Sequence, residues 1–194
     1  GAPGRVWESN APMVVAYVNP CVRAGADAVD CGVHGQPLNH PTSRGGTVIP
    51  NLREGASKAG RSAEDLEIIV PAFIVPIDGD EARWRNFARM QVAFYGSTPN
   101  YAFIFEQLGF DGTTDRIRER QRARDLAGMA AEVSDELLDH FVVTGPRSEL
   151  ADKILERYQG LATRVVSYFG GLDWTNDPSA LNAWADVARG VTNP

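Results

Sequence analysis

The most apolar segment of the chain runs Leu66-Glu67-Ile68-Ile69-Val70-Pro71-Ala72-Phe73-Ile74-Val75-Pro76-Ile77. Its richness in β-branched residues favours a strand that is buried on both faces over a helix. Pro71 is the awkward position, because proline donates no hydrogen bond to a strand ladder. We predict a central strand over residues 66–77.

Shorter apolar runs and helical patterns alternate on either side of this strand. Strands are predicted at residues 13–18, 31–34 and 164–169, with a short extended piece at 141–143. Helices are predicted at residues 21–29, 48–59, 147–158 and 178–189. Strand and helix therefore alternate four times, and such alternation predicts a parallel sheet with helical crossovers.

A large helical insertion interrupts the third of these units, at about residues 80–140. Its first helix, over residues 80–95, is expected to bury an apolar stripe of Trp84, Phe87, Met90 or Gln91, and Phe94. A helical stretch follows at 101–108. Residues 114–140 indicate a charged helix and a second helix that carries Leu126, Met129, Val133, Leu137 and Leu138. We expect one α/β domain over residues 12–194, preceded by an irregular segment at 1–11.

Composition narrows the class of protein. Of 194 residues, 43% are hydrophobic and 23% charged, which is typical of a globular chain. The formal net charge of −6 argues against a nucleic-acid partner, because such partners need clustered Lys and Arg. No apolar window is long enough for a membrane span, and we expect a cytoplasmic protein. Cys21 and Cys31 lack metal-binding or redox spacing, so no metal site is predicted.

Three motifs resemble a known family. They are Val18-Asn19-Pro20 with Gly32-Val33-His34-Gly35-Gln36-Pro37, then Gln91-Val92-Ala93-Phe94-Tyr95-Gly96-Ser97-Thr98-Pro99, and Phe141-Val142-Val143-Thr144-Gly145 with Glu149-Leu150-Ala151. Together they resemble the luciferase-like monooxygenase family, in particular its branch of oxidoreductases that depend on coenzyme F-420 (F420), a deazaflavin. The resemblance spans about residues 12–172 and implies a (β/α)8 TIM-barrel fold of which this chain covers about strands five to eight.

The same resemblance implies a division of roles. In this family, residues that face the redox ring lie largely on early strands, so the catalytic residues of this chain are unknown and its status as an enzyme is open. This half would supply the phosphate and tail side of the cofactor and one wall of the substrate pocket.

Candidate site residues follow from the rule that chemistry in such barrels gathers at the carboxyl ends of strands. Asn19 could hydrogen-bond a cofactor, or could be a turn residue before Pro20. His34 could donate to a phosphate, or could be a packed histidine. Gly35 would let a ligand approach the backbone, or could serve a plain turn. The predicted cofactor-binding residues are Tyr17, Val18, Asn19, Val33, His34, Gly35, Gln36, Gly170 and Gly171.

A second candidate region is the segment from Phe94 to Pro99. It could form a lid over the pocket, with Phe94 and Tyr95 facing the substrate. The structural alternative is that these aromatic side chains belong to the core, as aromatic residues at helical spacing often do.

Several functions are consistent with these observations. The first is an oxidoreductase that transfers a hydride between coenzyme F-420 and a small organic substrate. An FMN-dependent monooxygenase is the flavin-using alternative. The third is a catalytically inactive half-barrel that self-associates, because an open sheet has edges that proteins seldom leave unpaired. The expected partners are a small-molecule substrate and either further copies of the chain or a separate N-terminal half.

Overall fold

The computed structural model describes residues 14–16, 32–35, 38, 49–58, 60, 62, 64, 67–168, 175 and 177–192, with the backbone alone for 14–16 and 32–34. The predicted helix at 21–29 lies outside the described residues. So do six of the predicted cofactor-binding residues, which are Tyr17, Val18, Asn19, Gln36, Gly170 and Gly171.

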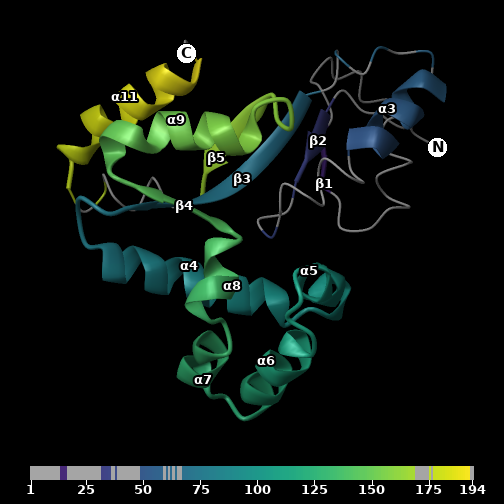
Figure 1. The fold of residues 1–194 in the computed structure, drawn as a ribbon, viewed down its shortest axis with the longest axis vertical. Helices are drawn as coiled ribbons and strands as arrows, with labels where there is room; N and C mark the ends of the chain where they lie inside the picture. The colour runs from purple at the N-terminus through teal and green to yellow at the C-terminus, as the bar shows by residue number, and fades with distance from the viewer. Residues whose placement is uncertain are drawn as a thin grey trace, which may run out of the picture.

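A parallel sheet organises the chain. Its strands are β1 (Val14–Ala16), β2 (Gly32–His34), β3 (Glu67–Pro76), β4 (Val142–Gly145) and β5 (Arg164–Ser167). Their order is β1-β2-β3-β4, and β5 pairs with β3 (Figure 1). Every pair is parallel, as predicted from the alternation of strands and helices. The extended piece predicted at 141–143 joins the sheet as β4.

Strand β3 is the centre of the sheet and accommodates Pro71 without losing a bond to β5. The carbonyls of Ile68 and Ala72 accept from the amides of Thr163 and Tyr168 on the β5 side. Since successive residues of a strand point their backbone groups to opposite sides, the nitrogen of Pro71 faces away from β5. The pairing of β2 with β3 ends at Ile69, so Pro71 lies past the part of β3 that pairs with β2 and is not needed as a donor there.

One face of the sheet is covered by α9 (Arg147–Tyr158) and α11 (Ala180–Thr192) (Figure 1). Alternate residues of β3 point into this layer, as the period of a strand requires. They pack against apolar side chains of both helices, and the cluster contains Val70, Ala72, Ile74, Val143, Leu150, Ile154, Tyr158, Ala180, Trp184 and Val187. The helix predicted at 48–59 is α3 (Ile49–Lys58), and it buries Ile49, Leu52 and Ala56.

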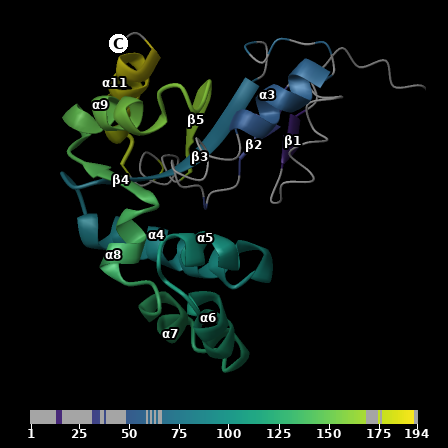
Figure 2. The same cartoon turned by 45° about the vertical axis from the view of Figure 1, so that its right-hand side comes forward.

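The helical insertion lies on the other side of the sheet from α9 and α11, as the two views show (Figures 1 and 2). It comprises α4 (Glu81–Gly96), η3 (Pro99–Tyr101), α5 (Ala102–Gln107), α6 (Thr113–Arg122), α7 (Leu126–Ala131) and α8 (Asp135–Asp139). Phe73 and Val75, the odd-numbered residues of β3, contribute to its core. None of the described helices has the length and apolarity to cross a membrane.

The buried stripe of α4 differs from the predicted one. Trp84 is buried as expected, but Phe87 is 38% and Phe94 58% exposed. The helix instead packs through Ala88 and Val92, which follow Trp84 at intervals of four residues. These smaller side chains allow close approach to neighbouring elements, whereas Phe87 and Phe94 lie on the outer side of the helix.

The helix predicted at the end of the insertion is two short helices, α7 and α8. Ser134 separates them, because its side chain accepts a hydrogen bond from the amide of Leu137 at 3.1 Å and so starts a new helix. Of the apolar residues of this segment, Met129, Val133, Leu137 and Leu138 are buried, whereas Leu126 is 62% exposed.

Candidate functional site

The carboxyl ends of β1 and β2 lie side by side. Ala16 of β1 is in register with His34 of β2, and His34 is in register with Ile69 of β3. Two of the three sequence segments predicted to bind cofactor, 17–19 and 33–36, thus lie at or directly after the ends of adjacent, paired strands in the sequence. The side chains of Val33 and His34 are outside the description, so their assigned roles stay predictions.

Gly35 marks the end of β2. It is buried, and its amide donates to the carbonyl of Ile69 at 2.7 Å. This bond extends the β2–β3 pairing by one residue and fixes the backbone at the strand end. Because the amide is already used, what Gly35 can offer a ligand is the space left by its missing side chain.

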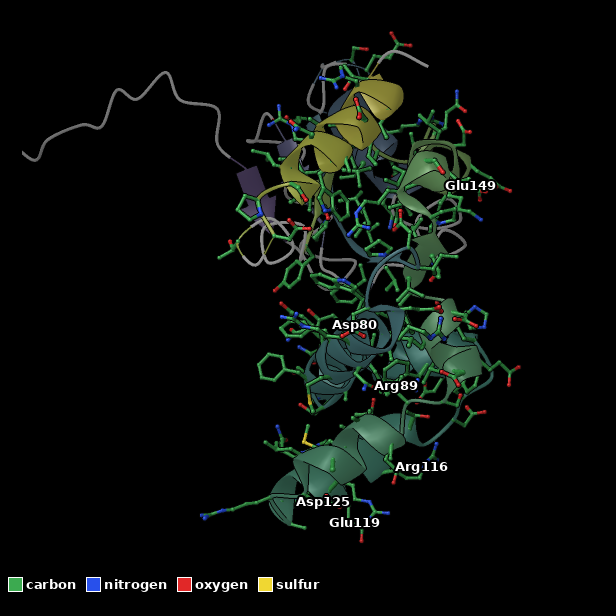
Figure 3. All side chains as sticks on the ribbon, turned by 90° about the vertical axis from the view of Figure 1, so that its left-hand side faces the viewer. Asp80, Arg89, Arg116, Glu119, Asp125 and Glu149 are labelled. Carbon is green, nitrogen blue, oxygen red and sulfur yellow. The ribbon has the colours of Figure 1, made fainter. Side chains whose placement is uncertain are left out.

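The carboxyl ends of β3 and β4 carry a different set of groups. Three aspartates accept hydrogen bonds from backbone amides where α4, α9 and α11 begin. Asp80 accepts from Arg83 at 3.1 Å, Asp78 from Arg147 at 3.1 Å, and Asp177 from Ser179 at 3.0 Å. Figure 3 shows Asp80 where the insertion meets the rest of the domain. Each carboxylate sits where the positive end of a helix would otherwise attract an anionic ligand.

A cavity of about 440 Å³ lies between these three helix starts. Arg147 lines it and pairs with Asp78, their side chains meeting at 2.6 Å. Two hydrogen bonds from Ser179, and secondarily the charge of Arg147, hold the pKa of Asp177 below its usual value. The lining contains three carboxylates and two guanidinium groups. Arg147 and the helix ends are thus already matched by aspartates of the chain itself, whereas the guanidinium of Arg83 lies over the ring of Trp84.

An aromatic surface lies at the ends of α4 and β5. Phe94 is exposed and its ring makes an edge-to-face contact with half-buried Tyr95. The hydroxyl of Tyr95 lies 2.7 Å from that of Tyr168, which follows β5. Tyr168 in turn packs edge-to-face on Phe73, with ring centroids 5.5 Å apart. Burial and the neighbouring tyrosines raise the pKa of Tyr95, so its phenol stays protonated at neutral pH.

These contacts show how the segment 94–99 is packed. They do not test the prediction that it forms a lid over the substrate pocket. The segment forms the last turn of α4 and the start of η3. A Cβ on Gly96 would lie 2.6 Å from the ring of Phe105, which explains why glycine occupies that position. Tyr168 was missed by sequence reasoning, because its pairing with Tyr95 joins positions 73 residues apart.

Ion pairs join α4 to α8 within the insertion. Arg85 contacts Asp135 at 3.2 Å and Asp139 at 2.8 Å, and Arg89, which is labelled in Figure 3, bonds both Asp135 and the carbonyl of Val133. Hydrogen bonds from Arg89 and then Arg85 lower the pKa of Asp135. Over the described ranges, no cluster of His, Cys, Asp and Glu side chains could hold a metal ion.

Comparison with known proteins gives a family match. The model of the luciferase-like monooxygenase family matches residues 8–164. Uncharacterized proteins of Mycobacterium bovis and Mycobacterium tuberculosis are 28% identical over 159 residues, which are 81% of this chain and 47% of each relative. A 5,10-methylenetetrahydromethanopterin reductase of Archaeoglobus fulgidus is 30% identical over 124 residues, 60% of this chain and 36% of that protein. The chain therefore spans about half the length, or less, of the curated relatives it matches.

Solved structures show the same fold. The coenzyme F420-dependent tetrahydromethanopterin reductase of Methanopyrus kandleri superposes with a TM-score of 0.67 at 24% identity, over 80% of this chain and 44% of that one. An F420-dependent secondary alcohol dehydrogenase in complex with an F420-acetone adduct gives a TM-score of 0.55 at 14% identity, over 82% and 43% of the two chains. The parallel sheet and its helices thus correspond to part of a TIM barrel, as predicted. With more than half of its residues matched by the family model, the chain belongs to the luciferase-like monooxygenase family.

Proposed function

We propose that this chain is part of an oxidoreductase that transfers a hydride between coenzyme F420 and a small organic substrate. Its own contribution is to bind the phosphate and tail side of the cofactor at the ends of β1 and β2. The observation that carries this proposal is the register between Ala16 and His34, because the two predicted binding segments lie at or directly after these paired strand ends in the sequence. The names of the reductase and dehydrogenase relatives support the choice of cofactor.

The residue types at this edge fit an anionic ligand. The segments Tyr17-Val18-Asn19-Pro20 and His34-Gly35-Gln36-Pro37 contain no acidic residue. They contain Asn19, His34 and Gln36, whose side chains can donate hydrogen bonds to phosphate oxygens. Gly35, which lies between His34 and Gln36 in the sequence, has no side chain that would obstruct a ligand.

The ends of β3 and β4 fit an anion less well. Carboxylates already cap the helices that begin there, and a phosphate would have to approach Asp78 and Asp177 against like charge. We therefore assign the phosphate to the β1–β2 end. The binding role of Gly170 and Gly171, which precede α11, stays a prediction.

When bound, the deazaflavin would supply the hydride chemistry. The residues of this chain would hold its tail, and the aromatic surface of Phe94 and Tyr95 would form a wall of the substrate pocket. A tetrahydromethanopterin reductase and a secondary alcohol dehydrogenase share this fold, so the substrate is not fixed by the fold.

The proposal is tested by titrating the purified chain with F420 and, separately, with FMN, following cofactor fluorescence. We expect saturable binding of F420 in the micromolar range and weaker binding after His34→Ala. Tighter binding of FMN would favour the FMN-dependent monooxygenase that the family's name suggests. Binding of neither cofactor would overturn the proposal in favour of an inactive half-barrel.

We also propose that the chain functions in an assembly, either with further copies or with a separate N-terminal half. On the sheet face opposite α9 and α11, Val166 is 41% and Tyr168 39% exposed. In a closed barrel, side chains from other strands would cover such positions. Light scattering of the purified chain tests self-association, because a stable monomer would contradict it.

A further inference from the structure

A cavity of about 400 Å³ lies along the side of β4, next to the later turns of α9. Its lining residues are Val142, Val143, Thr144, Lys153, Glu156 and Arg157. All of them belong to the continuous described stretch 67–168. The volume falls within the range of pockets that bind small molecules.

The backbone of β4 has a free edge at this cavity. The amide of Ile77 donates to the carbonyl of Gly145, so the backbone groups of Gly145 face β3. Because successive residues of a strand point their backbone groups to opposite sides, the amide of Thr144 points away from β3. No strand that the structure describes pairs with this second edge of β4. The amide of Thr144 is therefore available as a hydrogen-bond donor.

Arg157 contributes a positive charge that no carboxylate of the described residues pairs with. Its guanidinium donates to the carbonyl of Val142 at 2.9 Å and to the carbonyl of His140, and it lies 5.9 Å from the ring centre of Tyr158. The two carbonyls use two of its five N–H donors and leave the charge unneutralised. Within the described residues, Nε of Arg157 and Oγ1 of Thr144 are buried without a hydrogen-bond partner. Since such unpaired groups cost free energy, an acceptor entering the cavity would be favoured.

Lys153 places a second cation on the same face of α9, four residues before Arg157. Its stem lies over Gly145, where a Cβ would be 2.6 Å from Cε of the lysine, so only glycine allows this approach. Its ammonium is 3.8 Å from the carboxylate of Glu149, which Figure 3 labels on α9. That long, exposed pair is weak, whereas like charges four residues apart on a helix repel each other. An anion between the two cations would offset the repulsion.

The charges of the lining select the ligand. Two cations and the exposed carboxylate of Glu156 give the lining one net positive charge. A single carboxylate matches this balance, whereas a second negative charge would be repelled by Glu156. We propose that the cavity beside β4 binds a small organic monocarboxylate, whose oxygens accept from Lys153, Arg157 and the amide of Thr144. This inference stands apart from the proposed function, because none of these residues is assigned to the cofactor.

The probes that test this site are benzoate, benzamide and phenyl phosphate. They share a ring and carry one negative charge, none, and between about one and a half and two. Binding to the full chain is followed by the NMR amide resonances of Thr144 and Gly145. Lys153→Gln removes one cation, and Lys58→Gln is its matched control, because Lys58 also pairs with a glutamate four residues before it. Glu156→Gln removes the opposing charge and keeps the size of the side chain.

We expect benzoate to shift the Thr144 and Gly145 resonances in a saturable way, and benzamide to bind about tenfold more weakly. Lys153→Gln should weaken benzoate binding about fivefold, and Lys58→Gln should change it less than about twofold. Glu156→Gln should tighten it about twofold, a gain that a loss of folding could not produce. The proposal is overturned if benzoate gives no saturable shift, if benzamide or phenyl phosphate binds as tightly as benzoate, or if Lys58→Gln weakens binding as much as Lys153→Gln.

Discussion

The ends of β1 and β2 and the ends of β3 and β4 belong to one parallel sheet, yet they offer a ligand different chemistry. At the first, residues with hydrogen-bond donors and no acidic side chain follow strands that are in register. At the second, Asp78, Asp80 and Asp177 occupy the starts of three helices.

This difference shows that position in the fold does not by itself define an anion site. Helix starts near the last strands of a β/α barrel often bind phosphate. Here those helix starts are satisfied internally, and Asp78 also pairs with the guanidinium of Arg147. The contrast assigns anion binding to one end of the sheet and a structural role to the other, and it can be tested by substitutions at matched positions.

The largest expected effect is at Gly35. A Gly35→Val substitution places a branched side chain at a buried strand end whose amide is fixed to Ile69. We expect F420 affinity to fall about tenfold or more, which corresponds to roughly 1.4 kcal/mol. Fluorescence titration measures the affinity, and circular dichroism checks that the variant is folded.

Gly79→Ala is the control for that substitution. Its Cβ would lie 3.6 Å from the guanidinium of Arg147, an ordinary contact, and so the aspartate-capped end should tolerate it. We expect F420 affinity to stay within about twofold of the unmodified chain. Equal losses from the two glycine substitutions would remove the distinction between the two ends.

A smaller effect is expected from exchanging single polar groups. His34→Ala should weaken F420 binding about three- to tenfold, the range expected for the net contribution of one typical hydrogen bond. Asp78→Asn should leave that affinity unchanged, but lower the free energy of unfolding by about 1 kcal/mol, since the partly exposed carboxylate caps α9 and pairs with Arg147. Urea unfolding measures the second quantity. If Asp78→Asn weakened F420 binding as much as His34→Ala, the carboxylate would belong to the cofactor site.

The smallest expected effect is a pH dependence at the aspartate-capped end. Hydrogen bonds from Ser179 hold the pKa of folded Asp177 below its usual value. A depressed pKa stabilises the fold above the unfolded value of about 3.9, and the contribution is lost as the pH falls through the lower, folded pKa. Thermal midpoints between roughly pH 6 and pH 3 should therefore fall slightly more for the unmodified chain than for Asp177→Asn. Identical pH profiles would show that Asp177 does not stabilise the start of α11.

Helices and strands could be predicted from the sequence where the apolar pattern within one segment determines its structure. The apolar run from Ile68 to Pro76 forms the central strand, and the parallel order follows from its alternation with helices. The buried side of α4 could not be predicted from large apolar residues, because tertiary packing selects Ala88 and Val92 while Phe94 stays outside.

The site was predictable to a lesser extent. Asp80 before α4 has the pattern of a helix cap, so that contact could have been found from sequence. The contacts of Asp78 with Arg147 and of Tyr95 with Tyr168 join residues 69 and 73 positions apart. A helical or strand periodicity relates only residues that are close in sequence. Pairs so far apart are brought together by the fold and could not be predicted from such a pattern.

The most direct test of the central claim is to record NMR spectra of the chain with selectively labelled glycine amides during titration with F420. Gly35 reports on the β1–β2 end, and Gly79 and Gly145 report on the β3–β4 end, so one sample compares both. Our account predicts that the Gly35 resonance shifts in a saturable way while those of Gly79 and Gly145 stay in place. A saturable shift at Gly79 or Gly145 with none at Gly35 would contradict it.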